Sequence, residues 1–165
     1  MTEKNFSKEE FSHSIMLNLP ADKVFGYIAT GSGIAKWFIG NANYYYGEKS
    51  IRLGNETAVK GDSFLWKWLN KDLELKGIVT DSVKNKKFGF TFGPLFHVTI
   101  DLSQEHNRTK LLLTQKYQDP SVKNEFSYIN CCVCWVFFLT NLKSVAENGF
   151  DLRETEADNE MLVNR

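Results

Sequence analysis

Apolar and polar residues alternate at the start of the chain. From Phe11 to Leu19, apolar side chains and His13 occupy every second position, with serine, methionine and asparagine between them. A period of two is typical of a half-buried strand. The sequence therefore predicts a first strand that ends at Pro20.

Two short helices are expected next. Proline is tolerated in the first turn of a helix, and the apolar stripe of Val24, Phe25 and Ile28 marks the buried side of the first one. Residues 30–33, Thr-Gly-Ser-Gly, are expected to break it. A second short helix is then predicted to hold Ile34, Trp37 and Phe38.

Short apolar runs separated by polar turns fill the middle of the chain. We place six further strands at Tyr44–Leu53, Ser63–Leu69, Leu73–Asp81, Lys87–Phe92, His97–Leu102 and Lys110–Gln118. Strands joined by short turns form an antiparallel sheet, which gives seven strands in all.

One long helix is expected at the C-terminal end. No residue between Val122 and Gly149 breaks a helix, and Gly149 is a suitable C-cap. Its middle is apolar on nearly all sides, which predicts burial on more than one side. Laid across the concave side of a curved sheet, this helix hides the apolar face. The predicted architecture is α+β, in the order strand, two helices, six strands, helix.

Aromatic residues are unusually frequent, at 14% of the chain. They recur at alternate strand positions, so they line one face of the sheet. Plain core packing is one explanation; the other is an apolar cavity between sheet and helix, with a few polar groups to orient a ligand. The predicted ligand-binding residues are Trp37, Phe38, Trp66, Trp68, Phe88, Phe90, Phe92, Trp135 and Phe138. Hydroxyls from Tyr44, Tyr45, Tyr46 and Tyr117 are candidates for the polar groups.

Length and charge narrow the class of protein. The 165 residues predict one domain over 1–165, with a core at 11–149 and an acidic tail at 150–165. The 20 basic and 20 acidic residues balance, so no nucleic acid partner is expected. The apolar run Cys131–Leu139 is shorter than the ~20 residues of a membrane span, and no signal core precedes the first strand. We expect a cytoplasmic protein without a membrane span.

Motifs for catalysis or metal binding are lacking. His13, His97 and His106 have no partner at metal-ligand spacing, and Cys131, Cys132 and Cys134 have no second cysteine pair. The residues 30–33 lack the lysine of a phosphate loop. We predict no catalytic residues, no metal and no cofactor.

Several short motifs, in order and over nearly the whole chain, resemble the activator of heat-shock protein 90 ATPase homologue family of the START-like (SRPBCC) superfamily. The matching pieces are Leu19–Phe25, Lys36–Phe38, Gly61–Phe64, Gly77–Val79, Arg108–Leu111, Trp135, Leu139, Leu142, Lys143, and Gly149–Arg153. Asp62 and Arg108 each stand where the family pattern has glycine. The resemblance implies a helix-grip fold with a hydrophobic cavity.

Three functions stay open. The first is non-catalytic binding of a small hydrophobic or lipid-like molecule in the cavity. The second is protein interaction, as a chaperone-associated stress protein or a homodimer. The third is a cavity-based lyase or cyclase. The family resemblance does not choose among them, because one fold supports many activities.

Overall fold

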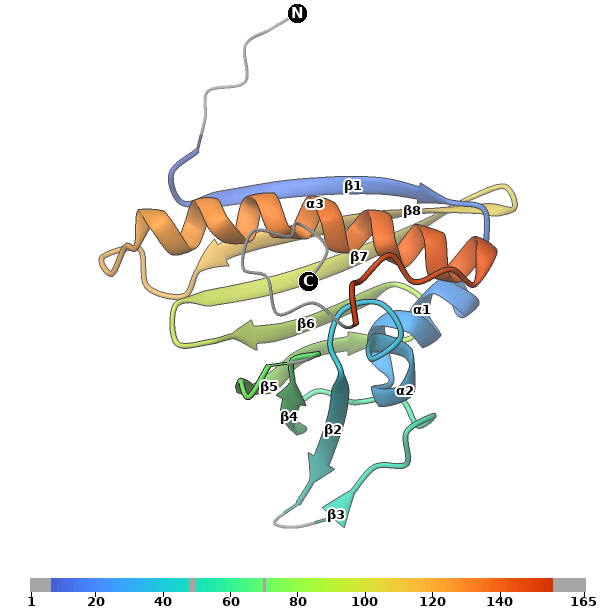
Figure 1. Cartoon of the computed structure of the whole chain (residues 1–165), viewed down its shortest axis with the longest axis horizontal. Helices are drawn as coiled ribbons and strands as arrows, with labels where there is room; N and C mark the ends of the chain where they lie inside the picture. Colours follow the sequence, from blue (N-terminus) through green and yellow to red (C-terminus); the bar gives the residue numbers. More distant parts are fainter. Residues whose placement is uncertain (1–6, 48–49, 70, 156–165) are drawn as a thin grey trace, which may run out of the picture.

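An eight-stranded antiparallel sheet, with a long helix lying across one face, forms the framework of the molecule (Figure 1). The computed structural model describes residues 7–47, 50–69 and 71–155. The strands are β1 (Glu10–Leu17), β2 (Asn41–Tyr46), β3 (Ser50–Ile51), β4 (Ser63–Lys67), β5 (Glu74–Val83), β6 (Lys87–Phe92), β7 (Phe96–Glu105) and β8 (Arg108–Tyr117). Their order across the sheet is β1-β8-β7-β6-β5-β4-β2-β3. The predicted helix-grip architecture is confirmed, with one strand more than expected.

The extra strand arises at a turn within the predicted strand Tyr44–Leu53. Gly47 has a φ of +59°, which ends β2, and β3 then pairs back onto β2. Glycine adopts this left-handed conformation without a steric penalty. The prediction of one continuous strand here was wrong because it overlooked that turn.

The alternation read from the sequence does set the faces of the strands. In β1, exposed side chains alternate with half-buried ones from Glu10 to Ile15, and Leu17 is fully buried. In β6, Phe88 and Phe90 are buried on the face that packs into the core. The pairing of β5 with β6 shifts register between Val79 and Asp81, and an irregularity of this kind bends a strand.

The first two helices are α1 (Ala21–Ala29) and α2 (Gly31–Ile34). The predicted break of the first helix is confirmed, because α1 ends at Ala29 and Thr30 is extended. A new helix, α2, then begins at Gly31, and the Thr30 hydroxyl caps it by accepting a 3.0 Å hydrogen bond from the Gly33 backbone N–H. A Cβ on Gly33 would lie 2.0 Å from the Gly26 carbonyl oxygen, so only glycine permits this close approach. Of the three residues predicted for the second helix, Ile34 lies in α2, whereas Trp37 and Phe38 follow it in a turn.

The long helix α3 (Glu125–Asn148) begins and ends at identifiable caps. The side chain of Asn124 accepts a hydrogen bond from the Ser127 N–H, and Gly149 adopts a φ of +71° at the C-terminus, as predicted. One side of α3 packs into the core through Trp135, Phe138, Leu139 and Leu142. The opposite side is exposed, so the expectation of burial on more than one side was wrong.

Among the described residues, α3 is the one helix whose length and hydropathy suit a membrane span, and about a third of its apolar window is buried. The buried residues include Trp135 and Leu142, which are 2% and 0% exposed within the main core cluster. A membrane-spanning position would remove them from that core. The structure therefore explains the apolar character of α3 in part by core packing.

Candidate functional site

Phe38 lies at the centre of the aromatic core. Its ring stacks on that of Trp135, with 4.7 Å between the ring centroids, and meets Phe138 edge to face at 4.8 Å. The centroids of four more rings lie within 6.1 Å of it, those of Trp37, Trp66, Trp68 and Phe92. Phe38 thus joins the helix side of the core to the sheet side.

All nine residues predicted to bind a ligand belong to this one apolar cluster. Seven are buried, and Trp68 and Phe92 are partly buried against the others. Because six neighbouring rings surround Phe38, a ligand that enters the centre of the cluster must take the place of its ring. The role of the nine residues in binding stays a prediction.

Two polar atoms at the sheet side of this cluster lack a partner. The Tyr44 hydroxyl on β2 and the Trp66 indole N–H on β4 are both buried, and neither makes a hydrogen bond of normal geometry within the described part of the chain. Burial raises the pKa of Tyr44 far above its usual value, although a hydrogen-bonding contact of poor geometry from the Trp66 N–H lowers it in part and the charge of Asp62 raises it further. The hydroxyl is therefore neutral at physiological pH and can donate a hydrogen bond to an acceptor.

A third such atom belongs to Gln115 on β8, which is fully buried. Its Oε1 accepts a 2.7 Å hydrogen bond from the Trp135 indole N–H. Its Nε2 makes no hydrogen bond of normal geometry among the described residues, although Gln115 lies close enough to the Cys131 sulfur to lower the pKa of that thiol in part. The sequence did carry a signal for this residue. Leu111, Leu113 and Tyr117 occupy the same inward phase of β8, so a glutamine between them points into the core.

The other predicted hydroxyls lie elsewhere. Tyr46 is about half exposed, beneath the guanidinium of Arg52. Tyr117 belongs to a second, smaller cluster, where its hydroxyl donates to the Asn124 carbonyl at 2.8 Å and accepts from the Asn124 N–H at 3.1 Å. Of the four tyrosines, only Tyr44 brings a buried, unpartnered hydroxyl into the main cluster.

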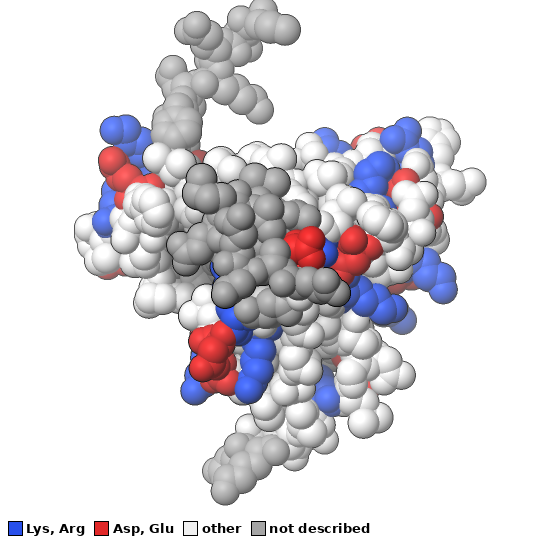
Figure 2. All heavy atoms as spheres, in the orientation of Figure 1, with Lys and Arg blue, Asp and Glu red and all other residues white. Residues whose placement is uncertain are grey.

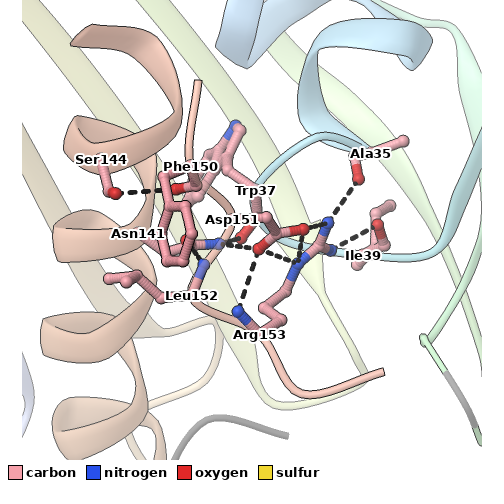
Figure 3. A network of polar contacts seen from close by, with 9 residues as sticks. All are labelled: Ala35, Trp37, Ile39, Asn141, Ser144, Phe150, Asp151, Leu152 and Arg153. Carbon is pink, nitrogen blue, oxygen red and sulfur yellow. Dashed lines mark hydrogen bonds and ion pairs between the residues drawn. The ribbon is translucent and has the colours of Figure 1, made fainter. Parts of the chain in front are cut away.

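The segment after α3 turns back and fastens onto the turn that carries Phe38 (Figure 3). The Arg153 guanidinium donates to the carbonyl oxygens of Ile39 and Ala35 at 2.8 and 3.0 Å. Asn141 on α3, fully buried, donates to the Trp37 carbonyl at 2.8 Å and accepts from the Leu152 N–H at 2.8 Å. We call residues 150–153 the C-terminal strap. It connects α3 to the turn at residues 35–39 and so holds the backbone of Phe38 in place.

Asp151 completes this network. Partial burial on its own raises the pKa of Asp151, but hydrogen bonds from Arg153 and Asn141 outweigh that effect and leave the pKa below its usual value. Its carboxylate therefore stays ionised at neutral pH beside the Arg153 guanidinium. Residues 150–155 of the predicted acidic tail are thus partly an anchor, and residues 156–165 lie outside the described part of the chain.

Asp62 stands where the family pattern has glycine, and the structure shows what its side chain does. Its carboxylate, 4% exposed, is held by the Arg52 guanidinium and accepts a 2.8 Å hydrogen bond from the Val59 N–H. A buried carboxylate is stable only when paired and hydrogen-bonded. Asp62 thereby fixes the loop before β4.

The histidines and cysteines form no cluster with other His, Cys, Asp or Glu residues that could hold a metal ion in the described ranges. His13 bonds the Cys132 carbonyl oxygen at 2.9 Å, and His97 bonds the Thr80 hydroxyl at 2.7 Å. Burial raises the pKa of each of the three cysteine thiols, which keeps them protonated and weakly nucleophilic.

Comparison with known proteins identifies the family. The family model described as "Activator of Hsp90 ATPase homolog 1-like protein" matches residues 18–147. No curated protein matches the chain.

Solved structures show the same fold at low sequence identity. Protein SSP2350 of Staphylococcus saprophyticus is 18% identical, with a TM-score of 0.69 over 87% of this chain and 96% of the other. The Aha1 dimer of Colwellia psychrerythraea is 18% identical, with a TM-score of 0.65 over 85% and 97%. DynU16, a putative protein of the dynemicin biosynthetic locus, is 16% identical, with a TM-score of 0.66 over 88% of this chain and 49% of DynU16. The family model covers most of the sequence, and the chain belongs to the activator of Hsp90 ATPase homolog 1-like family of START-like proteins.

Proposed function

We propose that this protein binds a small, mainly apolar molecule that carries a hydrogen-bond acceptor oxygen, in the aromatic core between the sheet and α3. The observation that carries the proposal is the set of buried donors without partners, at Tyr44, Trp66 and Gln115. A buried polar group without a hydrogen bond costs about 1–3 kcal/mol, so such groups are rare in a core that serves packing alone. A bound molecule would remove that cost.

The chemistry of the three groups limits the ligand. The Trp66 indole and the Gln115 amide nitrogen only donate hydrogen bonds, and the Tyr44 hydroxyl can do so. A carbonyl or ether oxygen suits them, whereas a second donor does not. The surrounding rings favour an aromatic or polyene skeleton.

Entry of this ligand requires Phe38 to move. Its ring fills the centre of the cluster, and the strap holds its backbone through Arg153 and Asn141. We propose that the bound state has the Phe38 side chain rotated out, with the ligand stacked on Trp135 in its place. Binding then costs the contacts that Phe38 loses.

Two matched ligands test the proposal, 2-acetylnaphthalene and 2-ethylnaphthalene, which have nearly the same shape and differ in the carbonyl oxygen. The ketone is expected to raise the melting temperature more than the hydrocarbon, because a ligand stabilises the folded state that it binds. Tyr44→Phe should reduce the difference between the two, whereas Tyr117→Phe should not. Phe38→Ala should strengthen the binding of both ligands.

The proposal fails under a clear condition. If the two naphthalenes and a wider panel of fatty acids, flavonoids and aromatic ketones all leave the melting temperature unchanged, in wild type and in Phe38→Ala, the core only packs. Tryptophan fluorescence provides a second readout, because Trp66 and Trp135 both belong to the cluster.

Protein interaction is the second candidate function, and the exposed side of α3 favours it. The Aha1 protein of C. psychrerythraea is a dimer, which supports a homodimer here. A chaperone partner of the kind the family description names is a narrower proposal. It is tested by the ATPase rate of a purified Hsp90 with and without this protein.

A lyase or cyclase lacks a comparable observation. In the described ranges, the buried carboxylate is Asp62, and Arg52 already neutralises it.

The three cysteines are free thiols, which suits the proposed cytoplasmic location.

A further inference from the structure

One side of α3 presents large apolar side chains to solvent. Phe126, Ile129, Val133 and Val136 are 81%, 57%, 65% and 52% exposed, and we call these four residues the outer stripe. They lie on the side of the helix opposite Trp135, Phe138 and Leu142, which fill the core. Single exposed apolar residues are common on proteins, but a continuous row along one helix marks a contact surface.

The spacing of the outer stripe is that of a helix that packs against another helix. Its residues are separated by three, four and three positions, which is the heptad spacing of a coiled-coil seam. This spacing places the four side chains in one straight row, roughly 15 Å long, on the surface of α3. A straight apolar row of this kind suits a second helix packed along it.

The part of α3 that carries the outer stripe has no charged residues, which limits the kinds of partner that it suits. No Asp, Glu, Lys or Arg occurs from Phe126 to Leu142. Figure 2 looks onto the side that carries α3, and Lys, Arg, Asp and Glu side chains are visible there towards both ends of the sheet. A membrane-surface helix normally has Lys and Arg along its polar side, so this stripe does not suit a lipid surface.

The chain's own C-terminal residues are also a poor match. Residues 156–165 carry acidic residues and a single apolar run at Met161, Leu162 and Val163. Three consecutive apolar residues cannot cover four residues spaced over three helical turns. The uncharged stripe offers no cation to the acidic side chains either.

We infer that the outer stripe is the interface with a second copy of this chain, packed helix to helix about a two-fold axis. In such an interface the same surface meets itself, so an uncharged apolar stripe is complementary to its copy without any electrostatic conflict. The exposed area of the four side chains is on the order of 400 Å². That is most of the roughly 500 Å² of apolar surface that each partner contributes to a standard homodimer interface.

This inference specifies the surface for the second proposed function and does not depend on the ligand. The test compares Val136→Glu with Ile78→Glu, since both residues are β-branched and 52% exposed and Ile78 lies on β5 rather than α3. Molar mass is measured by sedimentation and light scattering on the full chain, from about 1 to 200 µM, a range that covers micromolar dissociation constants.

We expect a wild-type dimer, a monomeric Val136→Glu variant and a dimeric Ile78→Glu variant. The dissociation constant of Val136→Glu should rise at least about 100-fold, because a carboxylate would be buried against an apolar copy. A cooperative melt of each variant shows that it is folded, and Ile129→Gln is a milder second variant with the same expected direction.

Other outcomes overturn the inference. A wild type that stays monomeric throughout the concentration range does so, and so does a dimer that survives Val136→Glu. A monomer that dimerises only after removal of residues 156–165 would show that the tail covers the stripe. Binding of the wild-type chain to anionic vesicles, lost in Val136→Glu, would assign the stripe to a membrane. None of these results bears on the ligand test with the naphthalenes.

Discussion

Two aromatic clusters in this molecule differ in how they treat their polar atoms. In the small cluster, the hydroxyl of Tyr117 makes two hydrogen bonds to the Asn124 backbone, and the hydroxyl of Tyr128 donates to the Ser7 carbonyl at 2.8 Å. In the large cluster around Phe38, Tyr44 and Trp66 have buried polar atoms without partners. The tyrosine hydroxyls of the small cluster, which packs β1 and β8 against α3, are therefore already hydrogen-bonded. The large one retains unused donors, which is why we propose a ligand there and not in the small cluster.

The largest expected effect concerns the core of the large cluster. Trp135→Ala should lower the free energy of unfolding by about 3–5 kcal/mol, because the ring is 2% exposed and its removal leaves a cavity. It also strands Gln115 Oε1, which accepts the indole N–H. Denaturant unfolding measures this loss. A loss below about 1 kcal/mol would mean that the cluster collapses around the gap.

Removing a hydroxyl from each cluster should have opposite effects. Tyr117→Phe should cost about 1–2 kcal/mol, since it leaves both backbone groups of Asn124 without their partner. Tyr44→Phe should be neutral or stabilise the protein by up to about 1 kcal/mol, since that hydroxyl is buried and unpartnered. Chemical denaturation of the two variants side by side decides the comparison. Equal losses in both would mean that Tyr44 has a partner in solution and that the two clusters do not differ.

The smallest expected effect is a pH dependence at the strap. The pKa of Asp151 is lower in the folded state than in the unfolded chain, so the folded state binds fewer protons there. The stabilisation is fully present above the ordinary aspartate pKa of about 4 and is lost as pH falls through the lower folded value. The melting temperature of wild type should therefore exceed that of Asp151→Asn at pH 6, and the gap between the two should narrow as the pH falls below the ordinary aspartate pKa of about 4. A gap that stays constant from pH 6 to pH 3 would show that the carboxylate contributes nothing through its charge.

The fold could be predicted where a period in the sequence reflects a face of an element. Alternation placed Phe88 and Phe90 on the core side of β6, and Gly149 marked the end of α3. The start of the second helix at Gly31 was missed because the capping of α2 by Thr30 and the contact of Gly33 with Gly26 depend on how two helices pack. No local pattern encodes such a contact.

The grouping of the nine aromatic residues was predictable, whereas the polar groups around them were less so, and the role of the rings in binding stays a prediction. All nine aromatic residues fall in one cluster because alternate positions on a sheet share a face. The contact of Arg153 with Ala35 and Ile39 joins residues far apart in the chain, and neither carbonyl carries a residue-specific signal. The exposed side of α3 was missed because an apolar residue on a mostly apolar helix gives no indication of which side faces water.

The strap has a consequence for the order in which the protein is made. The turn at residues 35–39 is synthesised early, but Arg153, which fastens it, leaves the ribosome near the end of synthesis. β1 likewise waits for β8, the last strand. Until then the aromatic face of the sheet has no helix to cover it, and nascent chains in that condition are prone to aggregate. A transcript cut short before α3 would thus yield a fragment that holdase chaperones and proteases must clear.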